Sequence, residues 1–161
     1  MGETTEDDAY VKVLRESLEK KVELLKLISK EDEVQARVLK DENSTPDELQ
    51  ATMDHKDAWV DQIATLDDGF SVIFDKVKPL LTDHKDKYRD EIARMKELVR
   101  DITDLTATVR KQEQENYNLL DQKFTNIRKQ VKKIRKSQSA VSSYYKTMNG
   151  EYDSQFLDKS K

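Results

Sequence analysis

Asn43-Ser44-Thr45-Pro46-Asp47-Glu48 is the stretch that decides the fold of this chain. Thr45 can cap a helix that begins at Pro46, because proline is well tolerated at the first helical position, where no N–H is needed. Glu48 stands three residues after Thr45 and completes a capping box. The sequence therefore predicts a helix start at Pro46. The short connection before it predicts that the two flanking helices lie antiparallel.

The segment before this turn carries a helical pattern over about residues 6–41. Its apolar residues recur at spacings of three and four, which places them on one face of a helix. They are Val11, Leu14, Leu18, Val22, Leu25 and Ile28. Opposite charges four residues apart, such as Glu16 and Lys20, contribute only about 0.2–0.5 kcal/mol per pair. The apolar face is therefore expected to hold this helix in place.

A second helix is expected over about residues 46–78, with a seam whose spacings alternate between four and three, as in a heptad repeat. The seam comprises Leu49, Met53, Lys56, Val60, Ile63, Asp67, Phe70, Phe74, Val77 and Leu81. It stays in phase through Gly69, so the helix should be unbroken there. Pro79 lacks a backbone donor and crowds the preceding turn. We therefore expect a reversal between residues 78 and 85, with Thr82-Asp83 as the next cap; a kinked continuation is the alternative.

The third helix is expected over about residues 83–148 and is the longest. Its apolar stripe comprises Tyr88, Ile92, Met95, Val99, Ile102, Val109, Leu120, Phe124, Ile127, Val131, Ile134, Val141 and Tyr145. At about 1.5 Å per residue, this helix would be roughly 100 Å long, about twice the reach of the other two. The stripe from Leu120 to Tyr145 therefore has no evident partner within the chain. Residues 149–161 are expected to form a mobile tail.

The composition supports this reading. Charged residues make up 39% of the 161 residues and apolar residues 35%, with three glycines and two prolines, which is typical of long helices that each bury one narrow stripe. We predict an all-α fold, an elongated antiparallel bundle or coiled coil of three long helices that forms one domain over residues 1–148.

The absence of cysteine, of a basic–apolar leader and of an apolar run near ~18 residues favours a reducing, cytoplasmic location.

The charge is unevenly distributed along the chain. Residues 1–80 carry 11 Lys/Arg against 20 Asp/Glu, and residues 81–161 carry 18 against 13. A basic run over residues 128–136 surrounds Ile127, Val131 and Ile134. The acidic first half would repel a polyanion, which disfavours nucleic acid as a partner. The role of the basic run stays open between a solvated face, an orienting surface for a protein partner, and a binding surface for nucleic acid or an anionic membrane.

No pattern in the sequence indicates catalysis. The two histidines, His55 and His84, stand on separate helical segments without the ligand spacing of a metal site. The chain has no glycine-rich phosphate loop and no nucleophile beside a base in a known motif. We therefore expect no catalytic residues, no metal, no cofactor and no small-molecule substrate. The protein is expected to bind another protein and not to be an enzyme.

The assembled pattern resembles the FlgN/FliT-type flagellar export chaperones. The resemblance rests on Asp54-His55-Lys56 and the segment from Val60 to Asp67 in the second helix, on Gln114-Glu115-Asn116 in the third, and on two stretches near the end of the chain. These last stretches are Tyr144-Tyr145 and Gln155-Phe156-Leu157-Asp158. The resemblance spans most of the chain, and the order of its features is more specific than any one of them.

The resemblance implies that this chain holds the C-terminal helices of late flagellar subunits, such as hook-associated or cap proteins, before export. It also implies that the chain contacts components of the export apparatus. Such a client helix would lie in an apolar groove of the chaperone. The residues expected to bind it are Asn116, Leu120, Phe124, Ile127, Val131, Ile134, Val141 and Tyr145. Two alternatives stay open: a structural coiled-coil scaffold or tether without an escort role, and self-association of the stripe into a homodimer.

Overall fold

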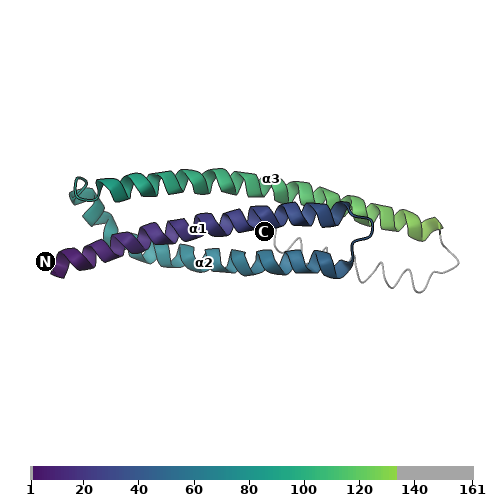
Figure 1. Cartoon of the computed structure of the whole chain (residues 1–161), viewed down its shortest axis with the longest axis horizontal. Coiled ribbons are helices and arrows are strands. Elements are labelled where there is room, and N and C mark those ends of the chain that lie inside the picture. The colour runs from purple at the N-terminus through teal and green to yellow at the C-terminus, as the bar shows by residue number, and fades with distance from the viewer. Residues whose placement is uncertain (1, 134–161) are drawn as a thin grey trace. The chain divides into compact units, whose positions relative to one another are not determined.

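The computed structural model describes the backbone of residues 2–133 and the side chains of residues 6–132. It contains three α-helices, α1 (Gly2–Lys40), α2 (Pro46–Asp83) and α3 (Arg89–Lys133), and the described residues include no strand. α1 and α3 run in one direction and α2 runs in the opposite direction (Figure 1). The all-α fold of three helices is therefore confirmed. α3 is the longest helix of the described part, with 45 residues.

The turn between α1 and α2 forms as its sequence predicts. The Thr45 hydroxyl accepts a hydrogen bond from the Glu48 N–H at 3.2 Å, so it caps the helix that begins at Pro46. The Asp41 carbonyl accepts two bonds from Ser44, from its N–H at 3.2 Å and from its hydroxyl at 2.8 Å. These contacts satisfy backbone groups at the end of one helix and the start of the next.

The expected interruption at Pro79 is wrong, because α2 continues through this residue to Asp83. Pro79 is exposed on the outer face of the helix, and so is Asp75, whose carbonyl it leaves without a donor. Water can hydrate a carbonyl at that position, which reduces the cost of the missing bond. Val77 is buried in a core cluster that Leu81 also contacts, and this packing holds the helix on both sides of the proline.

The reversal lies over residues 84–88, and α3 begins at Arg89 instead of near residue 83. Thr82 does not cap α3, because its hydroxyl donates back to the Lys78 carbonyl at 2.9 Å within α2. Tyr88 closes the turn: its side chain is 5% exposed, and its hydroxyl donates to Asp8 Oδ1 at 3.0 Å. The buried aromatic ring thus fixes the start of α3 against α1.

The three helices together form two compact units. Among the described residues, unit 1 contains residues 2–29 and 58–108, and unit 2 contains residues 30–57 and 109–133. In unit 1 two apolar clusters form the core, whose buried members are Val11, Leu14, Leu18, Val22, Val77, Tyr88 and Leu98. An ion pair between Arg15 Nε and Glu91 Oε2, 2.8 Å apart, joins α1 to α3 beside this core.

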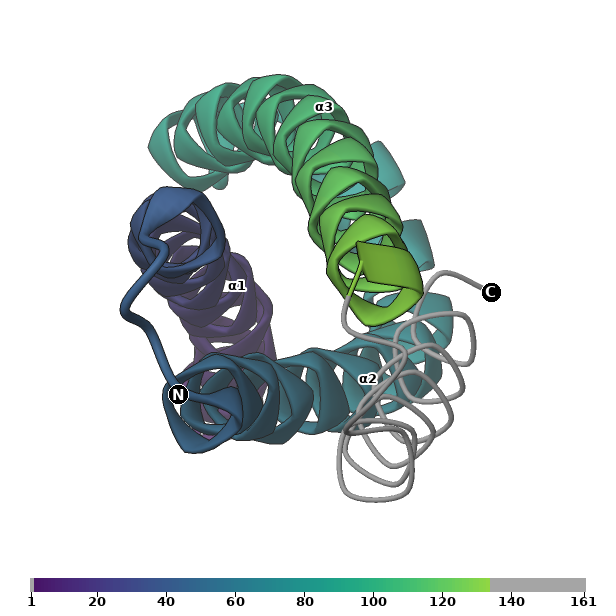
Figure 2. The same cartoon turned by 90° about the vertical axis from the view of Figure 1, so that its right-hand side faces the viewer.

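Unit 2, viewed end-on in Figure 2, combines the end of α1, the beginning of α2 and the last part of α3. Its apolar core comprises Leu39, Leu49, Met53, Leu120 and Phe124, each at most 6% exposed. Val38, Tyr117, Leu119 and Ile127 pack around it. Each helix contributes at least one buried residue, so the three segments of this unit pack on one another.

Other sequence predictions extend beyond the described residues. The single domain over residues 1–148 stays a prediction, and residues 134–148 of it lie outside the described part, as does the expected tail over residues 149–161. Within residues 2–133 no helix has both the length and the apolar character needed to cross a membrane.

Candidate partner-binding surface

The predicted binding stripe begins inside the core of unit 2. Asn116, Leu120 and Phe124 are each 2% exposed, and the two apolar side chains pack against Leu39 of α1 and against α2. The expectation that this stripe has no partner within the chain is therefore wrong for Leu120 and Phe124. These two residues lie where the α1–α2 hairpin still covers α3.

The stripe emerges from the core further along α3. Lys123 marks this change, because its Nζ donates to the hydroxyl of Ser44 in the α1–α2 turn at 2.7 Å. Ile127 lies at the edge of the core, and Val131 is partly exposed and is not part of a core cluster. Ile134, Val141 and Tyr145, the other predicted binding residues, lie outside the described residues.

The basic run begins beside this emerging stripe. Arg128, Lys129 and Lys132 have exposed side chains, while the side chains of the remaining basic residues up to residue 136 are outside the described part. Lys123, one turn earlier, is partly buried, and this burial lowers its pKa. Ile127 and Val131 are therefore bordered by solvent-exposed cations.

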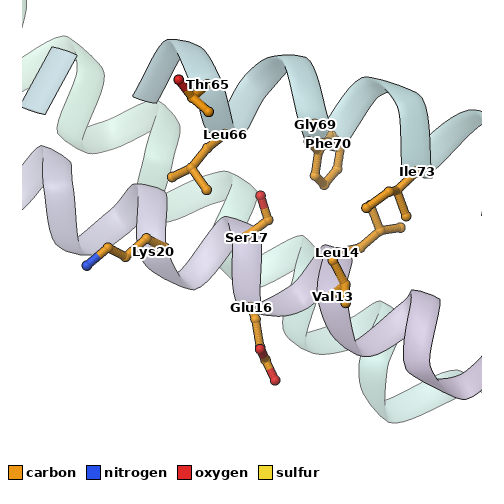
Figure 3. Close-up of a pocket in the computed structure, with 10 residues that line it drawn as sticks. All are labelled: Val13, Leu14, Glu16, Ser17, Lys20, Thr65, Leu66, Gly69, Phe70 and Ile73. Atoms are coloured by element: carbon orange, nitrogen blue, oxygen red, sulfur yellow. The ribbon is translucent and has the colours of Figure 1, made fainter. Parts of the chain in front are cut away.

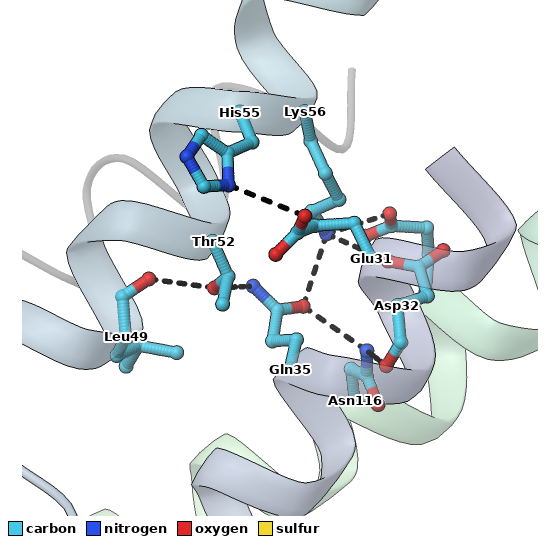
Figure 4. A network of polar contacts seen from close by, with 9 residues as sticks. Glu31, Asp32, Gln35, Leu49, Thr52, His55, Lys56 and Asn116 are labelled. Atoms are coloured by element: carbon cyan, nitrogen blue, oxygen red, sulfur yellow. Dashed lines mark hydrogen bonds and ion pairs between the residues drawn. The ribbon is translucent and has the colours of Figure 1, made fainter. Parts of the chain in front are cut away.

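A buried polar network lies next to the core of unit 2 and was not predicted. Side chains from all three helices converge there (Figure 4). Lys56 Nζ donates to Asp32 Oδ1 at 2.9 Å, to Gln35 Oε1 at 3.0 Å and to Glu113 Oε1 at 2.7 Å. Asn116 Nδ2 donates to Gln35 Oε1 and to the Asp32 carbonyl, both at 3.0 Å. One lysine thus joins α1, α2 and α3.

The network carries more negative than positive charge. Asp32 is 1% exposed, and its second carboxylate oxygen, Oδ2, accepts no hydrogen bond. Burial first, and then hydrogen bonding to and repulsion by the Glu113 carboxylate, together raise the Asp32 pKa to about 7, against the attraction of Lys56. One ammonium group cannot neutralise two carboxylates, so a proton shared between them stabilises the cluster.

The arrangement of this network indicates a structural role, which is to align the three helices. Buried polar groups of this kind fix the register of packed helices, because a slip by one position would leave each of them without its partners. Sequence spacing contained a signal for it: Asp32, Gln35 and Leu39 continue the α1 stripe from Ile28 at spacings of four, three and four. The stripe predicted from the sequence ends at Ile28, and its next two members, Asp32 and Gln35, are polar.

The two histidines lie on the surface. His55 has an exposed side chain whose Nδ1 is 3.2 Å from Glu31 Oε2, and His84 is exposed in the turn between α2 and α3. The described residues contain no cluster of three or more His, Cys, Asp or Glu side chains arranged to hold a metal ion.

A pocket of about 330 Å³ lies between α1 and α2 in unit 1 (Figure 3). Leu66 and Phe70 point from α2 toward α1 and form much of its apolar wall. Glu16 and Lys20 at its edge pair with neighbours on α1 instead, Glu16 with Lys12 at 3.7 Å and Lys20 with Glu23 at 3.6 Å. General acid–base chemistry needs titratable groups that converge on a substrate. This pocket offers an apolar wall without such a pair.

The chain was compared with known proteins. A family model described as FlgN protein matches residues 6–152. No curated protein and no solved structure matches the chain. The family match begins in α1 and extends past the end of α3, so it covers both units and most of the chain.

Proposed function

The chain belongs to the FlgN family, whose members are flagellar export chaperones and not enzymes, and we propose that it escorts a late flagellar subunit. The client is a hook-associated or cap protein, held by its C-terminal helical region and kept unassembled before secretion. In this role the protein works in the cytoplasm and hands its client to the export apparatus. It needs no cofactor, because binding and release are its whole task.

The observation that carries the proposal is the course of α3 past the α1–α2 turn. Lys123 contacts Ser44 in that turn, and α3 continues to Lys133. The ten residues from Lys123 to Lys133 extend α3 by roughly 15 Å beyond this contact. Ile127 and Val131 lie on this last part, with the helix period of Leu120 and Phe124 but with more exposure. A stripe that continues beyond its internal partner suits an external one.

Binding of the client adds a packing layer to the part of α3 that extends past the α1–α2 turn. An amphipathic client helix places its apolar face on Ile127, Val131 and the predicted positions Ile134, Val141 and Tyr145. Asn116, Leu120 and Phe124 contribute from within the core, by holding α3 against the hairpin. The exposed cations at Arg128, Lys129 and Lys132 orient an acidic client and increase its rate of association. Because the client helix is covered, its own assembly surface is blocked.

Titration calorimetry against the C-terminal helical segment of a hook-associated protein tests the proposal. Ile127→Glu and Val131→Glu should each weaken binding at least tenfold. Val131→Glu should leave the thermal melt nearly unchanged, whereas Ile127→Glu should lower it, because Ile127 packs at the edge of the core. Val60→Glu is the matched control, since Val60 is 48% exposed on α2 and should tolerate the charge without affecting binding. Normal binding by the α3 variants would place the client elsewhere. If no flagellar segment binds but the protein self-associates through these residues, the coiled-coil scaffold is the better reading.

A further inference from the structure

A second apolar surface lies in unit 1, in an open groove of about 1010 Å³ between α2 and α3. Its floor is made by Phe70, Phe74, Leu81, Ile92, Met95 and Val99. The rings of Phe70 and Phe74 stack with their centroids 5.7 Å apart, and Val99 is 50% exposed. Apolar area of this kind is costly to leave in water, so the groove favours an apolar occupant.

The rim of this groove is basic. It carries Lys78, Lys85, Arg89, Lys96 and Arg100, and its single acidic residue is Asp86. Asp86 pairs with Arg89 at 3.2 Å. Across the part of the chain that the structure describes, no ion pair joins Lys78, Lys85, Lys96 or Arg100 to an acidic side chain. Four cations around an apolar floor are thus available to an anionic partner, although residues 1–80 are acidic overall.

We propose that this groove binds an amphipathic helix with an acidic polar face, supplied by another protein. The apolar floor selects a helix with anchors at positions i, i+3, i+4 and i+7, and the basic rim selects carboxylates on its flanks. A nucleic acid would contact the rim but could not cover the phenylalanine floor. Charge complementarity and apolar area therefore point to the same class of occupant.

The length of the groove sets the size of the bound segment. On α2 the lining runs from Phe70 to Thr82, which corresponds to roughly 18 Å of helix. A helix of about three turns can therefore span it, as a third helix laid across two. The groove belongs to unit 1, and the client stripe on α3 belongs to unit 2. The inference therefore does not rest on the flagellar client and would hold with a different one.

A synthetic amphipathic helix of about 18 residues, with leucine anchors and glutamate flanks, serves as the probe. Fluorescence anisotropy with the full-length protein should give a micromolar Kd. The Lys78→Glu and Lys96→Glu double variant should weaken binding about tenfold at about 50 mM salt and much less at about 500 mM salt, because salt screens the rim. The matched control is Lys76→Glu, an exposed α2 lysine outside the groove, which should leave the Kd unchanged.

Apolar contact is tested separately. Val99→Glu should abolish binding without lowering the thermal stability, since Val99 is half exposed. Val72→Glu is its control, because Val72 is 60% exposed on α2 and does not line the groove. Equal affinity for a peptide with lysine flanks, or normal binding by the Val99→Glu variant, would overturn the proposal.

A photo-crosslinking residue at position 93, where Ala93 lines the groove with an exposed side chain, identifies the occupant. A crosslink to the acidic peptide supports the proposal. A crosslink to a second copy of the protein, or to residues 134–161 of the same chain, that persists with excess peptide would assign the groove to self-association or to the chain's own end. Either result would overturn the proposal.

Discussion

Lys56→Met tests whether the buried network stabilises unit 2 as its geometry indicates. The Lys56 side chain is 9% exposed and donates three hydrogen bonds, two of them to carboxylates. Methionine keeps the length of the side chain but removes the charge. Above pH 7 this leaves the buried Asp32 carboxylate without a cation. Removing one partner of a buried ion pair costs about 3–5 kcal/mol.

The cost should depend on pH. Above pH 7 the wild-type Asp32 is ionised and paired with Lys56, so the variant must either bury an unpaired carboxylate or bind a proton. We expect the free energy of unfolding to fall by about 3–5 kcal/mol at pH 8. At pH 5 Asp32 is largely protonated in both proteins, because its native pKa is raised to about 7. The loss there should be only about 1–2 kcal/mol, the value of the missing hydrogen bonds.

Urea denaturation followed by circular dichroism at both pH values measures these losses. Lys21→Met is the matched control: Lys21 also pairs with a carboxylate, Asp67 Oδ1 at 2.8 Å, but this pair has side chains 24% and 50% exposed. Such an ion pair contributes less than about 1 kcal/mol. A loss for Lys56→Met that equals the Lys21→Met loss, or one that is the same at pH 5 and pH 8, would refute the reasoning.

Three further predictions follow from the contacts. Thr45→Ala should lower the free energy of unfolding by about 1 kcal/mol, because the Glu48 N–H loses its cap, and an unchanged urea midpoint would contradict this. Phe124→Ala should cost about 3–5 kcal/mol but Val131→Ala less than about 1 kcal/mol, and thermal melts that shift equally would show that both sites are core. As the pH rises from 4 to 7, the free energy of unfolding of the wild type should fall by roughly 2–4 kcal/mol relative to that of Asp32→Asn, because the native state holds the Asp32 proton more tightly than the unfolded chain does. If the two proteins show parallel stability profiles over this pH range, Asp32 does not bind a proton more tightly in the native state.

The helix start at Pro46 could be predicted because its determinants are local. Thr45 and Glu48 are close in sequence, and the cap needs no distant contact. The end of α2 could not be predicted in the same way. The local effect of Pro79 favours a break, but Val77 and Leu81 pack against a distant part of the chain and keep the helix continuous. Tertiary packing overrode local propensity there.

The candidate site could be predicted only in part for a related reason. A helical period identifies which residues share a face, but it does not tell whether that face meets the same chain or another one. Leu120, Phe124, Ile127 and Val131 follow one period, yet the first two are core and Val131 is not. The boundary between the core part and the exposed part of the stripe is set by the α1–α2 turn, which lies beside Lys123. This position depends on tertiary structure and cannot be read from the helical period.

Because the buried and exposed parts of the stripe lie on one helix, the core of unit 2 supports the proposed client-binding surface. A rigid binding surface needs support from packed residues beneath it or beside it. On α3 that support comes from Phe124 and Leu120, which anchor the helix to the hairpin, and from the Lys56 network, which fixes its register. Ile127 and Val131 are then held on a helix that cannot rotate freely. A client helix would therefore meet an ordered apolar stripe, and less conformational entropy would be lost on binding than with a flexible one.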